Sequence, residues 1–198
     1  MASYGGSFFD NVATHSNETT MKSILLAMVC FASMACGPNA TITHAQLGGF
    51  FGGSPHVAKV DAKELNAMLT KQSDLEKSAE ASGKPKPTAD FVVVDVRTDA
   101  EVNVSVIPGA ITKADYEKNR DRYAGRMVIP YCTIGGRSGR YALELQKQGI
   151  PVKNFKGSIL EWASEELPLV TLDGKPTTQV HIYSDTYSVP PMYQPVTR

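Results

Sequence analysis

The sequence lacks an excess of either charge, and it lacks the motifs of several common enzyme classes. Its 20 basic and 20 acidic side chains give a net charge of +0, and they form no basic stripe of the kind that nucleic-acid binding needs. The four histidines show no metal-ligand spacing. A Gly-x-Ser-x-Gly elbow, a phosphate loop and a dinucleotide fingerprint are absent as well. We therefore expect no nucleic-acid partner, no metal and no dissociable cofactor.

Long apolar stretches are also scarce, with one exception near the N-terminus. Lys22 precedes the apolar stretch 24–36, which is too short for a comfortable membrane span. A basic residue, an apolar run and a following Gly-Pro break are typical of a secretory signal. We place its start at Met21 and predict that residues 1–45 are an upstream extension and a signal peptide, cleaved after Ala45. The protein is then exported, as a periplasmic or a secreted protein.

Two other interpretations of this stretch stay open. Cys36 could become a lipidated first residue, as in bacterial lipoproteins, and would then anchor the exported chain. The stretch could also be a buried core helix, although no polar face makes it amphipathic. Contact with a membrane is expected only through the signal or through such an anchor.

Cysteine is rare, and its distribution singles out one thiol. Cys30 and Cys36 both lie in the predicted targeting segment, so Cys132 is the only cysteine of the predicted mature chain. It then has no intramolecular disulfide partner. A lone thiol in an exported protein is either a buried bystander or a reactive group, and the residues around it must decide between the two.

The remaining sequence predicts an α/β domain. Glycine-rich residues 46–55 form a linker, residues 56–172 form the domain, and residues 173–198 form a Pro- and Tyr-rich tail. Strands that alternate with helices predict a central parallel sheet of about five strands, flanked by helices. The expected strands are 56–60, 91–96, a short one ending at 111, 127–131 and 152–155. The expected helices are 62–71, 113–124, 140–148 and 159–166, and residues 72–90, which are polar, charged and interrupted by proline and glycine, form a loop that could begin as a fraying extension of the helix 62–71.

The segment after the strand 127–131 is suited to hold an anion beside Cys132. A thiol is a nucleophile only as the thiolate, so a reactive cysteine needs surroundings that favour negative charge. Gly135, Gly136 and Gly139 allow backbone N–H groups to converge, and the following helix directs its positive end at the same point. Arg137 adds a planar cation that suits an oxyanion, such as the sulfonate end of thiosulfate. These features favour a reactive thiolate.

Four separated motifs resemble those of the rhodanese family of sulfurtransferases. The family's loop runs Cys-x-x-Gly-x-Arg-Ser, and it is matched position by position by Cys132, Gly135, Arg137 and Ser138. The other motifs resemble Val94-Asp95-Val96-Arg97 with Glu101, Ile107-Pro108-Gly109-Ala110, and Gly157 with Trp162. The resemblance spans residues 57–172, although Ser105-Val106 stands where the family often has Gly-His.

The resemblance implies an activity and a set of substrate-binding residues. Cys132 would attack a small anionic sulfur donor such as thiosulfate and carry the sulfane sulfur as a persulfide. An external thiol or a cyanide-like acceptor would then remove it. The expected substrate-binding residues are Thr133, Ile134, Gly135, Gly136, Arg137 and Ser138: the backbone N–H groups of 133–137 would stabilise the sulfur, Arg137 would hold the donor's anionic group, and Thr133 and Ile134 would shape the entrance.

Three further residues are expected to support this site. By the same resemblance, Arg97 and Glu101 form a structural ion pair rather than a catalytic one. Asp95 is expected to support the loop from the neighbouring strand end.

Two other functions stay open. Cell-cycle phosphatases and some arsenate reductases resemble the rhodanese fold, but their Cys-to-Arg loops contain one residue more than the four between Cys132 and Arg137. The shorter loop favours a smaller sulfur cradle. A rhodanese module could also act as a non-enzymatic persulfide carrier, or dock a partner through the Tyr-rich tail.

Overall fold

The computed structural model describes residues 56–197. The predicted signal peptide and linker lie outside the described residues. Within the described part, no helix is long and apolar enough to cross a membrane. The strands are β1 (Ala58–Val60), β2 (Phe91–Asp95), β3 (Ile111–Thr112), β4 (Met127–Tyr131), β5 (Lys153–Phe155), β6 (Leu169–Val170), β7 (Pro176–Thr177), β8 (Gln179–His181) and β9 (Gln194–Val196). The helices are α1 (Ala62–Ala81), α2 (Asp99–Val102), α3 (Lys113–Lys118), α4 (Gly136–Lys147) and α5 (Ser158–Ser164), with a 3₁₀ turn at Arg120–Tyr123.

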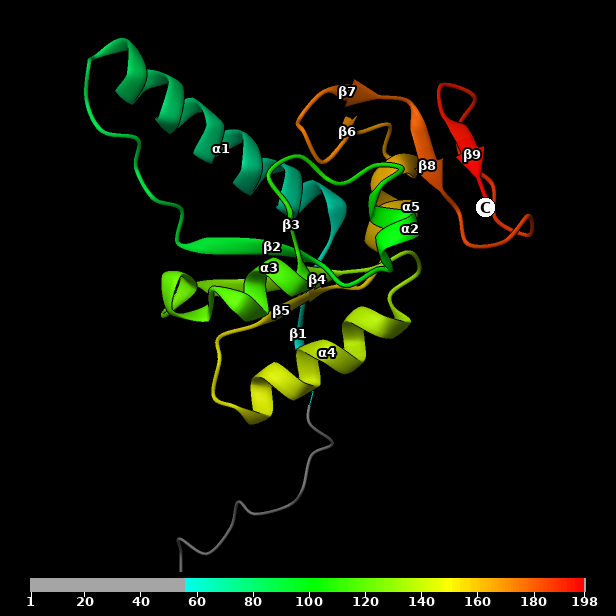
Figure 1. The fold of residues 1–198 in the computed structure, drawn as a ribbon, viewed down its shortest axis with the longest axis horizontal. Coiled ribbons are helices and arrows are strands. Elements are labelled where there is room, and N and C mark those ends of the chain that lie inside the picture. Colours follow the sequence, from blue (N-terminus) through cyan, green and yellow to red (C-terminus); the bar gives the residue numbers. More distant parts are fainter. Residues whose placement is uncertain (1–55, 198) are drawn as a thin grey trace, which may run out of the picture. The chain divides into compact units, whose positions relative to one another are not determined.

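Parallel strands form the centre of the α/β fold (Figure 1). β3, β2 and β4 make a three-stranded sheet in that order, and β1 pairs with β5. A single parallel bridge between Val128 and Val152 links the two sheets, and the Val128 N–H donates to the carbonyl oxygen of Pro151 at 2.8 Å. The α/β class and the parallel pairing are confirmed. The expected central sheet of about five strands is not confirmed, because β4 and β5 are joined only by that one bridge.

Two apolar clusters cover the two faces of the sheet, because side chains alternate along a strand. Phe91 and Val93 of β2 pack with side chains of α1 and α5, whereas Val92 and Val94 pack with side chains of α3 and α4. Figure 1 shows α1 on one side of the strands and α4 on the other. All five residues of β2 are buried, as its β-branched run predicts.

Helix α1 is longer than predicted. It continues from the expected segment 62–71 as far as Ala81, so the extension expected at most as a fraying start of the loop 72–90 is ten residues of regular helix. Polar side chains four positions apart support the extension, since Gln72 Nε2 donates to Glu76 Oε1 at 2.7 Å. No glycine or proline interrupts residues 72–82. The glycine and prolines that favoured a loop, Gly83, Pro85 and Pro87, all lie after the end of α1.

The segment predicted as a tail packs into the same core as the predicted domain. β8 and β9 pair in parallel, and Val180, Ile182 and Tyr193 belong to the apolar cluster that also contains residues of α1 and α5. Among the described residues, packing therefore crosses the expected boundary at residue 172.

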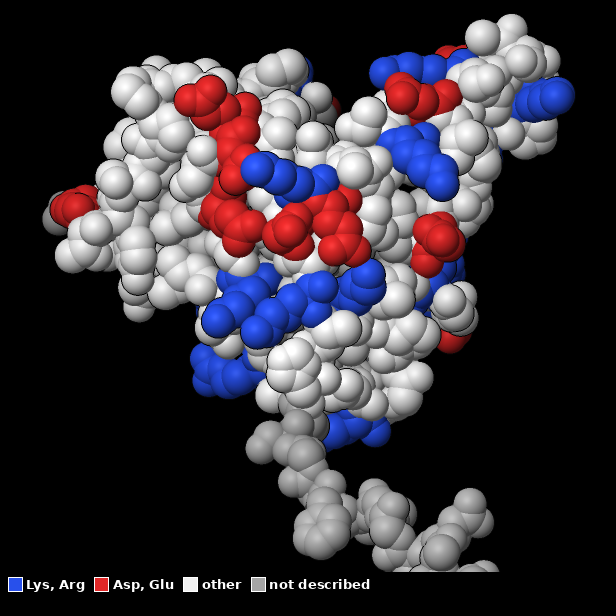
Figure 2. Space-filling model, turned by 180° about the vertical axis from the view of Figure 1, so that it is seen from behind, with Lys and Arg blue, Asp and Glu red and all other residues white. Residues whose placement is uncertain are grey.

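Exposed charges pair between elements that are distant in the sequence. Lys153 Nζ lies 2.8 Å from Glu64 Oε1, and Lys63 Nζ lies 3.7 Å from Glu165 Oε2. On the face in Figure 2, acidic and basic side chains lie in neighbouring bands. Exposed pairs contribute at most about 1 kcal/mol each, so the apolar clusters provide most of the stability.

Candidate active site

Cys132 lies at the carboxyl end of β4, in the loop that leads into α4. Helix α4 begins at Gly136 rather than near residue 140 as predicted, and Gly135 is its N-cap in the left-handed conformation, with φ of 90°. A Cβ at position 135 would collide with the carbonyl oxygen of Lys156, so only glycine fits there. Gly136 and Gly139, which were also expected to curl this loop, lie inside α4 and have no positive φ.

The sulfur of Cys132 accepts hydrogen bonds from neutral groups of the loop and of α5. The Gly135 N–H donates to Sγ at 3.0 Å, and Ser158 Oγ lies 3.8 Å from it. Cys132 is only 1% exposed. Burial raises the pKa of the thiol, but hydrogen bonds from Ser138, Ser158 and Gly135 outweigh burial, so the pKa is lowered from its ordinary value of 9.0. The site therefore favours the thiolate.

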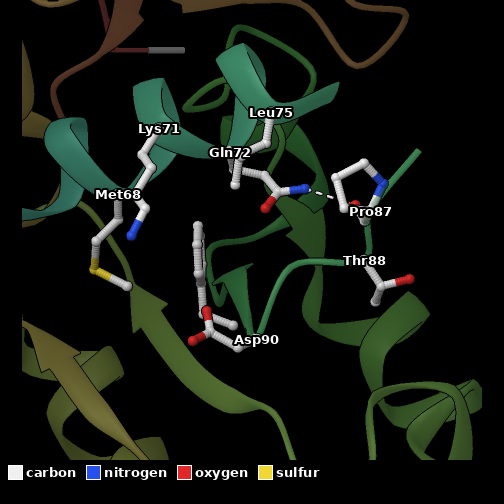
Figure 3. A pocket seen from close by; sticks show the side chains of 8 residues that line it. Met68, Lys71, Gln72, Leu75, Pro87, Thr88 and Asp90 are labelled. Carbon is white, nitrogen blue, oxygen red and sulfur yellow. Dashed lines mark hydrogen bonds between the residues drawn. The ribbon is translucent and has the colours of Figure 1, made fainter. Parts of the chain in front are cut away.

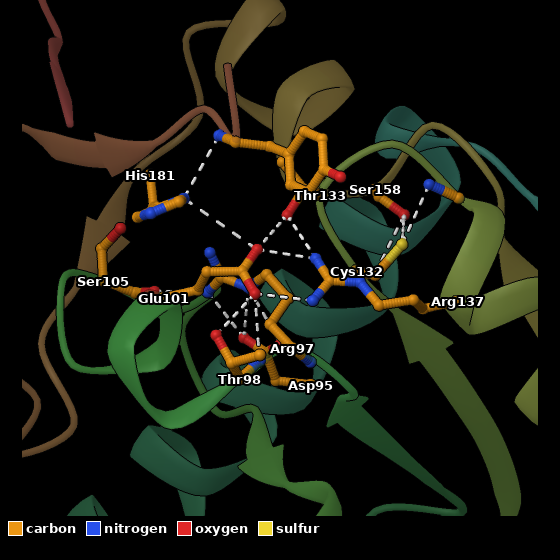
Figure 4. Close-up of polar contacts among 12 residues, drawn as sticks. Asp95, Arg97, Thr98, Glu101, Ser105, Cys132, Thr133, Arg137, Ser158 and His181 are labelled. Carbon is orange, nitrogen blue, oxygen red and sulfur yellow. Dashed lines mark hydrogen bonds and ion pairs between the residues drawn. The ribbon is translucent and has the colours of Figure 1, made fainter. Parts of the chain in front are cut away.

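Arg137 is held by Glu101 of α2 rather than extending freely toward a substrate. Nη1 lies 2.6 Å from Oε2 and Nη2 lies 2.6 Å from Oε1, an arrangement that Figure 4 shows. Burial raises the pKa of the Glu101 carboxyl, but hydrogen bonds from Arg137, Thr133 and Thr98 hold it well below its usual range. The Arg137 side chain is still 30% exposed, so part of the guanidinium faces solvent.

The ion pair expected between Arg97 and Glu101 is wrong, because Arg97 pairs with Asp95. Arg97 Nη2 lies 2.7 Å from Asp95 Oδ2, and both side chains are fully buried. Arg97 Nη2 also donates to the carbonyl oxygen of Ser105 at 2.5 Å. Asp95 and Arg97 are two positions apart at the end of β2, so their side chains pair without any contact from α2. Glu101 of α2 therefore remains available to pair with Arg137. Asp95 fixes this strand end through Arg97 and makes no hydrogen bond to the Cys132 loop among the described contacts.

Thr133 lies inside the site rather than at its entrance. It is 0% exposed, and its hydroxyl donates to Glu101 Oε1 at 2.6 Å and accepts from Arg137 Nη2 at 3.0 Å. Ile134 is 47% exposed. Of the two residues expected to shape the entrance, only Ile134 reaches the surface.

A small basic hollow adjoins Arg137. Its volume is about 270 Å³, and Lys113 and Arg140 line it together with one acidic residue, Glu144. A larger hollow of about 400 Å³ lies between α1 and β2, away from the Cys132 loop; the labelled residues of Figure 3 that line it are Met68, Lys71, Gln72, Leu75, Pro87, Thr88 and Asp90. The basic side chains of the smaller hollow suit a small anion, and Arg137 is one of the residues that line it.

Two residues at this site were not among the site residues predicted from the sequence. Ser158 is fully buried, accepts the Cys132 N–H at 3.0 Å, and has a left-handed φ of 60°. His181 of β8 lies with Nδ1 3.9 Å from Glu101 Oε1. The Gly157-Ser158 pair after a strand was a local signal for Ser158, whereas no sequence spacing connects His181 with the loop. No cluster of three or more potential metal ligands occurs within residues 56–197.

The segment that contains the Cys132 loop is similar in sequence to known proteins. The family model described as the rhodanese-like domain matches residues 74–165. A sulfurtransferase of Allochromatium vinosum is 35% identical over 97 residues, which cover 44% of this chain and 85% of that relative.

Two further comparisons are more distant. A tRNA uridine(34) hydroxylase of Thiobacillus denitrificans is 29% identical over 112 residues, and the chain spans only 42% of its length. A solved structure of a rhodanese-related protein from Thermoplasma volcanium has a TM-score of 0.43 and 18% identity, and the match covers 57% of this chain and 97% of that one. Because the match to the Allochromatium sulfurtransferase extends over most of that relative, the chain belongs to the rhodanese-like domain family.

Proposed function

We propose that this protein is a sulfurtransferase that carries a sulfane sulfur as a persulfide on Cys132. The observation that supports this most is the Gly135 N–H, 3.0 Å from the sulfur of a thiol whose pKa is lowered although the residue is buried. A thiolate held by neutral donors keeps its negative charge and stays nucleophilic. The Allochromatium vinosum relative is named a sulfurtransferase, which agrees with this proposal.

The proposed reaction needs no outside oxidant or reductant. The Cys132 thiolate attacks the outer sulfur of thiosulfate, a bond forms between the two sulfurs, and the bond between that outer sulfur and the sulfonate sulfur breaks. Its electron pair leaves with sulfite, and the cysteine persulfide keeps one negative charge. An acceptor such as cyanide or a thiolate then attacks the outer sulfur and restores the Cys132 thiolate.

The charges beside the loop favour an anionic donor. Arg137 is paired with Glu101 but 30% exposed, and the hollow next to it adds Lys113 and Arg140. Cations in a recess raise the local concentration of small anions. A donor whose sulfonate lies in this hollow would contact Arg137, which follows Cys132 by five residues.

Phosphatase or arsenate chemistry is less well supported. The loop has only four residues between Cys132 and Arg137, one fewer than the loops of the phosphatases and arsenate reductases that resemble the fold. A non-enzymatic carrier would share the persulfide but would not turn over.

Discharge of the persulfide is proposed to need an external acceptor. Cys132 is the only cysteine among the described residues, and its thiol is free. Cys30 and Cys36 lie in the segment predicted to direct export. No second thiol of a mature exported chain would then resolve the persulfide.

The proposal is tested by supplying competing substrates to one preparation. We expect thiocyanate to form from thiosulfate and cyanide, over many turnovers per chain, and we expect no phosphate release from an aryl phosphate. Cys132→Ser serves as the blank. Phosphate release without thiocyanate would favour the phosphatase, and a single turnover would favour the carrier.

A further inference from the structure

The C-terminal segment places a histidine next to the Glu101–Arg137 pair. His181 lies at the end of β8, outside the residues 74–165 that match the family, and it is 8% exposed. Its Nδ1 is 3.9 Å from Glu101 Oε1. Figure 4 shows His181 and Arg137 on opposite sides of Glu101. One carboxylate therefore stands between the loop and a segment that lies outside the family match.

The turn after β8 holds His181 in a defined neutral form. The Tyr183 N–H donates to Nδ1 at 3.2 Å, so Nδ1 carries a lone pair and the ring proton is on Nε2. Tyr183 is 62% exposed and has a left-handed φ of 67°, which strains a residue other than glycine. The contact with His181 is thus part of a strained, exposed turn.

Three charged groups act on the imidazole. Burial lowers the pKa of His181 from its ordinary value of 6.5, the Glu101 carboxylate raises it, and Arg97 and Arg137 lower it. The ring is therefore neutral near pH 7 and takes up its proton at a pH below its ordinary pKa of 6.5.

Protonation changes both contacts of Nδ1 together. An imidazolium Nδ1 is a donor and no longer accepts the Tyr183 N–H. The carboxylate oxygen beside it, Glu101 Oε1, already accepts from Thr133 Oγ1 and from Arg137 Nη2 at 2.6 Å each. A third donor at this oxygen competes with Arg137, because a carboxylate oxygen has few acceptor positions.

We propose that His181 is a positioning residue that sets how firmly Glu101 holds Arg137. With neutral His181, Glu101 binds both guanidinium nitrogens and offsets the charge of Arg137. With protonated His181, Glu101 is shared, the Arg137 charge is less offset, and a small anion reaches Cys132 more readily. The identity of that anion as a sulfur donor rests on the proposed function, whereas the electrostatic coupling does not.

The test compares two alkylating reagents of different charge on the full-length chain. Iodoacetate is an anion and iodoacetamide is neutral, and both react only with the thiolate, so the ratio of their rates at Cys132 cancels the titration of the thiol itself. We expect this ratio to rise about fivefold as the pH falls through the His181 titration, the lower end of usual coupling between two sites. In His181→Asn, whose side-chain oxygen can still accept the Tyr183 N–H, the ratio should not change with pH.

A matched control and a measurement without a variant complete the test. His56→Asn replaces an exposed histidine and should leave the rise intact. In the wild-type chain, the midpoint of the ratio should coincide with the midpoint of the His181 imidazole signal in an NMR titration. A flat ratio in the wild type, an equal rise in His181→Asn, or separate midpoints would overturn the proposal. Neither reagent is a sulfur donor, so failure to form a persulfide would refute the sulfur transfer alone.

Discussion

Glu101 binds both terminal nitrogens of Arg137, with both N–O distances at 2.6 Å. This contact joins α2 to the first turn of α4, so it holds the Cys132 loop against the end of β2. It also offsets much of the Arg137 charge. The Gly135 N–H is the nearest donor to the sulfur at 3.0 Å. The hydrogen bonds to Glu101 raise the pKa of Arg137 most, and the charge of Cys132 still raises it further. Arg137 thus has a structural role beyond the donor-binding role expected from the sequence.

Removal of the Glu101 charge should destabilise the fold. Glu101→Gln leaves the Arg137 guanidinium without its carboxylate in a partly buried position, and we expect the free energy of unfolding to fall by about 2 kcal/mol. Glu64→Gln is the control, since its pair with Lys153 at 2.8 Å is more exposed and should contribute about 0.5 kcal/mol or less. Urea unfolding measures both, and equal losses would contradict this account.

Acid should remove the contribution of Glu101. Its folded pKa lies below the ordinary value of 4.5, so the unfolded chain binds this proton at a higher pH than the folded chain does. The stabilisation is therefore complete well above pH 4.5 and is lost as the pH falls below that value. The stability difference between the wild type and Glu101→Gln should shrink below pH 4.5. A difference that stays constant over that range would show that the charge of Glu101 is not its source.

Two adjacent glycines should respond differently to alanine. In Gly135→Ala, the alanine must adopt a left-handed φ, and its Cβ collides with the Lys156 carbonyl oxygen. We therefore expect the free energy of unfolding to fall by about 2 kcal/mol or more. Gly136→Ala has open space around Cβ and lies at the helix start, so stability should be unchanged or slightly higher. Iodoacetamide labelling should slow at Cys132 in Gly135→Ala only. Similar behaviour of the two variants would argue against the described loop conformation.

Two variants separate the effect of the Ser158 hydroxyl from the effect of its left-handed backbone conformation. Ser158→Gly and Ser158→Ala both remove the hydroxyl near Sγ, so both should reduce alkylation of Cys132 at neutral pH by about fivefold, the effect of one hydrogen bond. Glycine also fits the φ of 60°, so Ser158→Gly should be more stable than Ser158→Ala by about 1 kcal/mol.

Glu166→Gly is the control for this pair of variants. Glu166 also has a left-handed φ, 56°, but is exposed and lies beyond α5. Glu166→Gly should therefore be more stable than the wild type, and the alkylation rate of Cys132 should not change. If reactivity instead followed stability across the three variants, the hydroxyl would have no direct effect on the sulfur.

The C-terminal segment should be required for stability. Val180 is 0% exposed within the main apolar cluster, so Val180→Ala should cost about 2 kcal/mol. Met192 is 49% exposed, and Met192→Ala should change stability by less than about 0.5 kcal/mol. A thermal or urea midpoint that did not move in Val180→Ala would mean that this segment merely covers the surface.

Local patterns explain what could be predicted from the sequence. The β-branched run of β2 and the strand leading to Cys132 had to be buried strands, and the order of cysteine, glycine and arginine in the loop indicated an anion cradle. The motif also identified Asp95, Arg97 and Glu101 as residues near the site. These features depend on neighbouring residues, so periodicity and motif spacing suffice to find them.

Contacts between distant segments could not be predicted in this way. Asp95 and Glu101 are both close to Arg97 in the sequence, and spacing alone cannot decide which acid pairs with Arg97 and which pairs with Arg137. His181 comes within 3.9 Å of Glu101 because the C-terminal segment packs into the apolar cluster that contains residues of α1 and α5. The polar residues 72–81 continue α1 because the apolar residues before them pack into the core and fix the start of the helix. The composition of residues 72–81 alone does not show this.

The most direct test of sulfur transfer is the mass of the protein after incubation with thiosulfate. We predict that the intact chain gains the mass of one sulfur atom, that peptide mapping places it on Cys132, and that cyanide removes it with release of thiocyanate. Cys132→Ser should show no gain. An unchanged mass of the wild-type chain, or a sulfur atom found on another residue, would contradict the proposed persulfide.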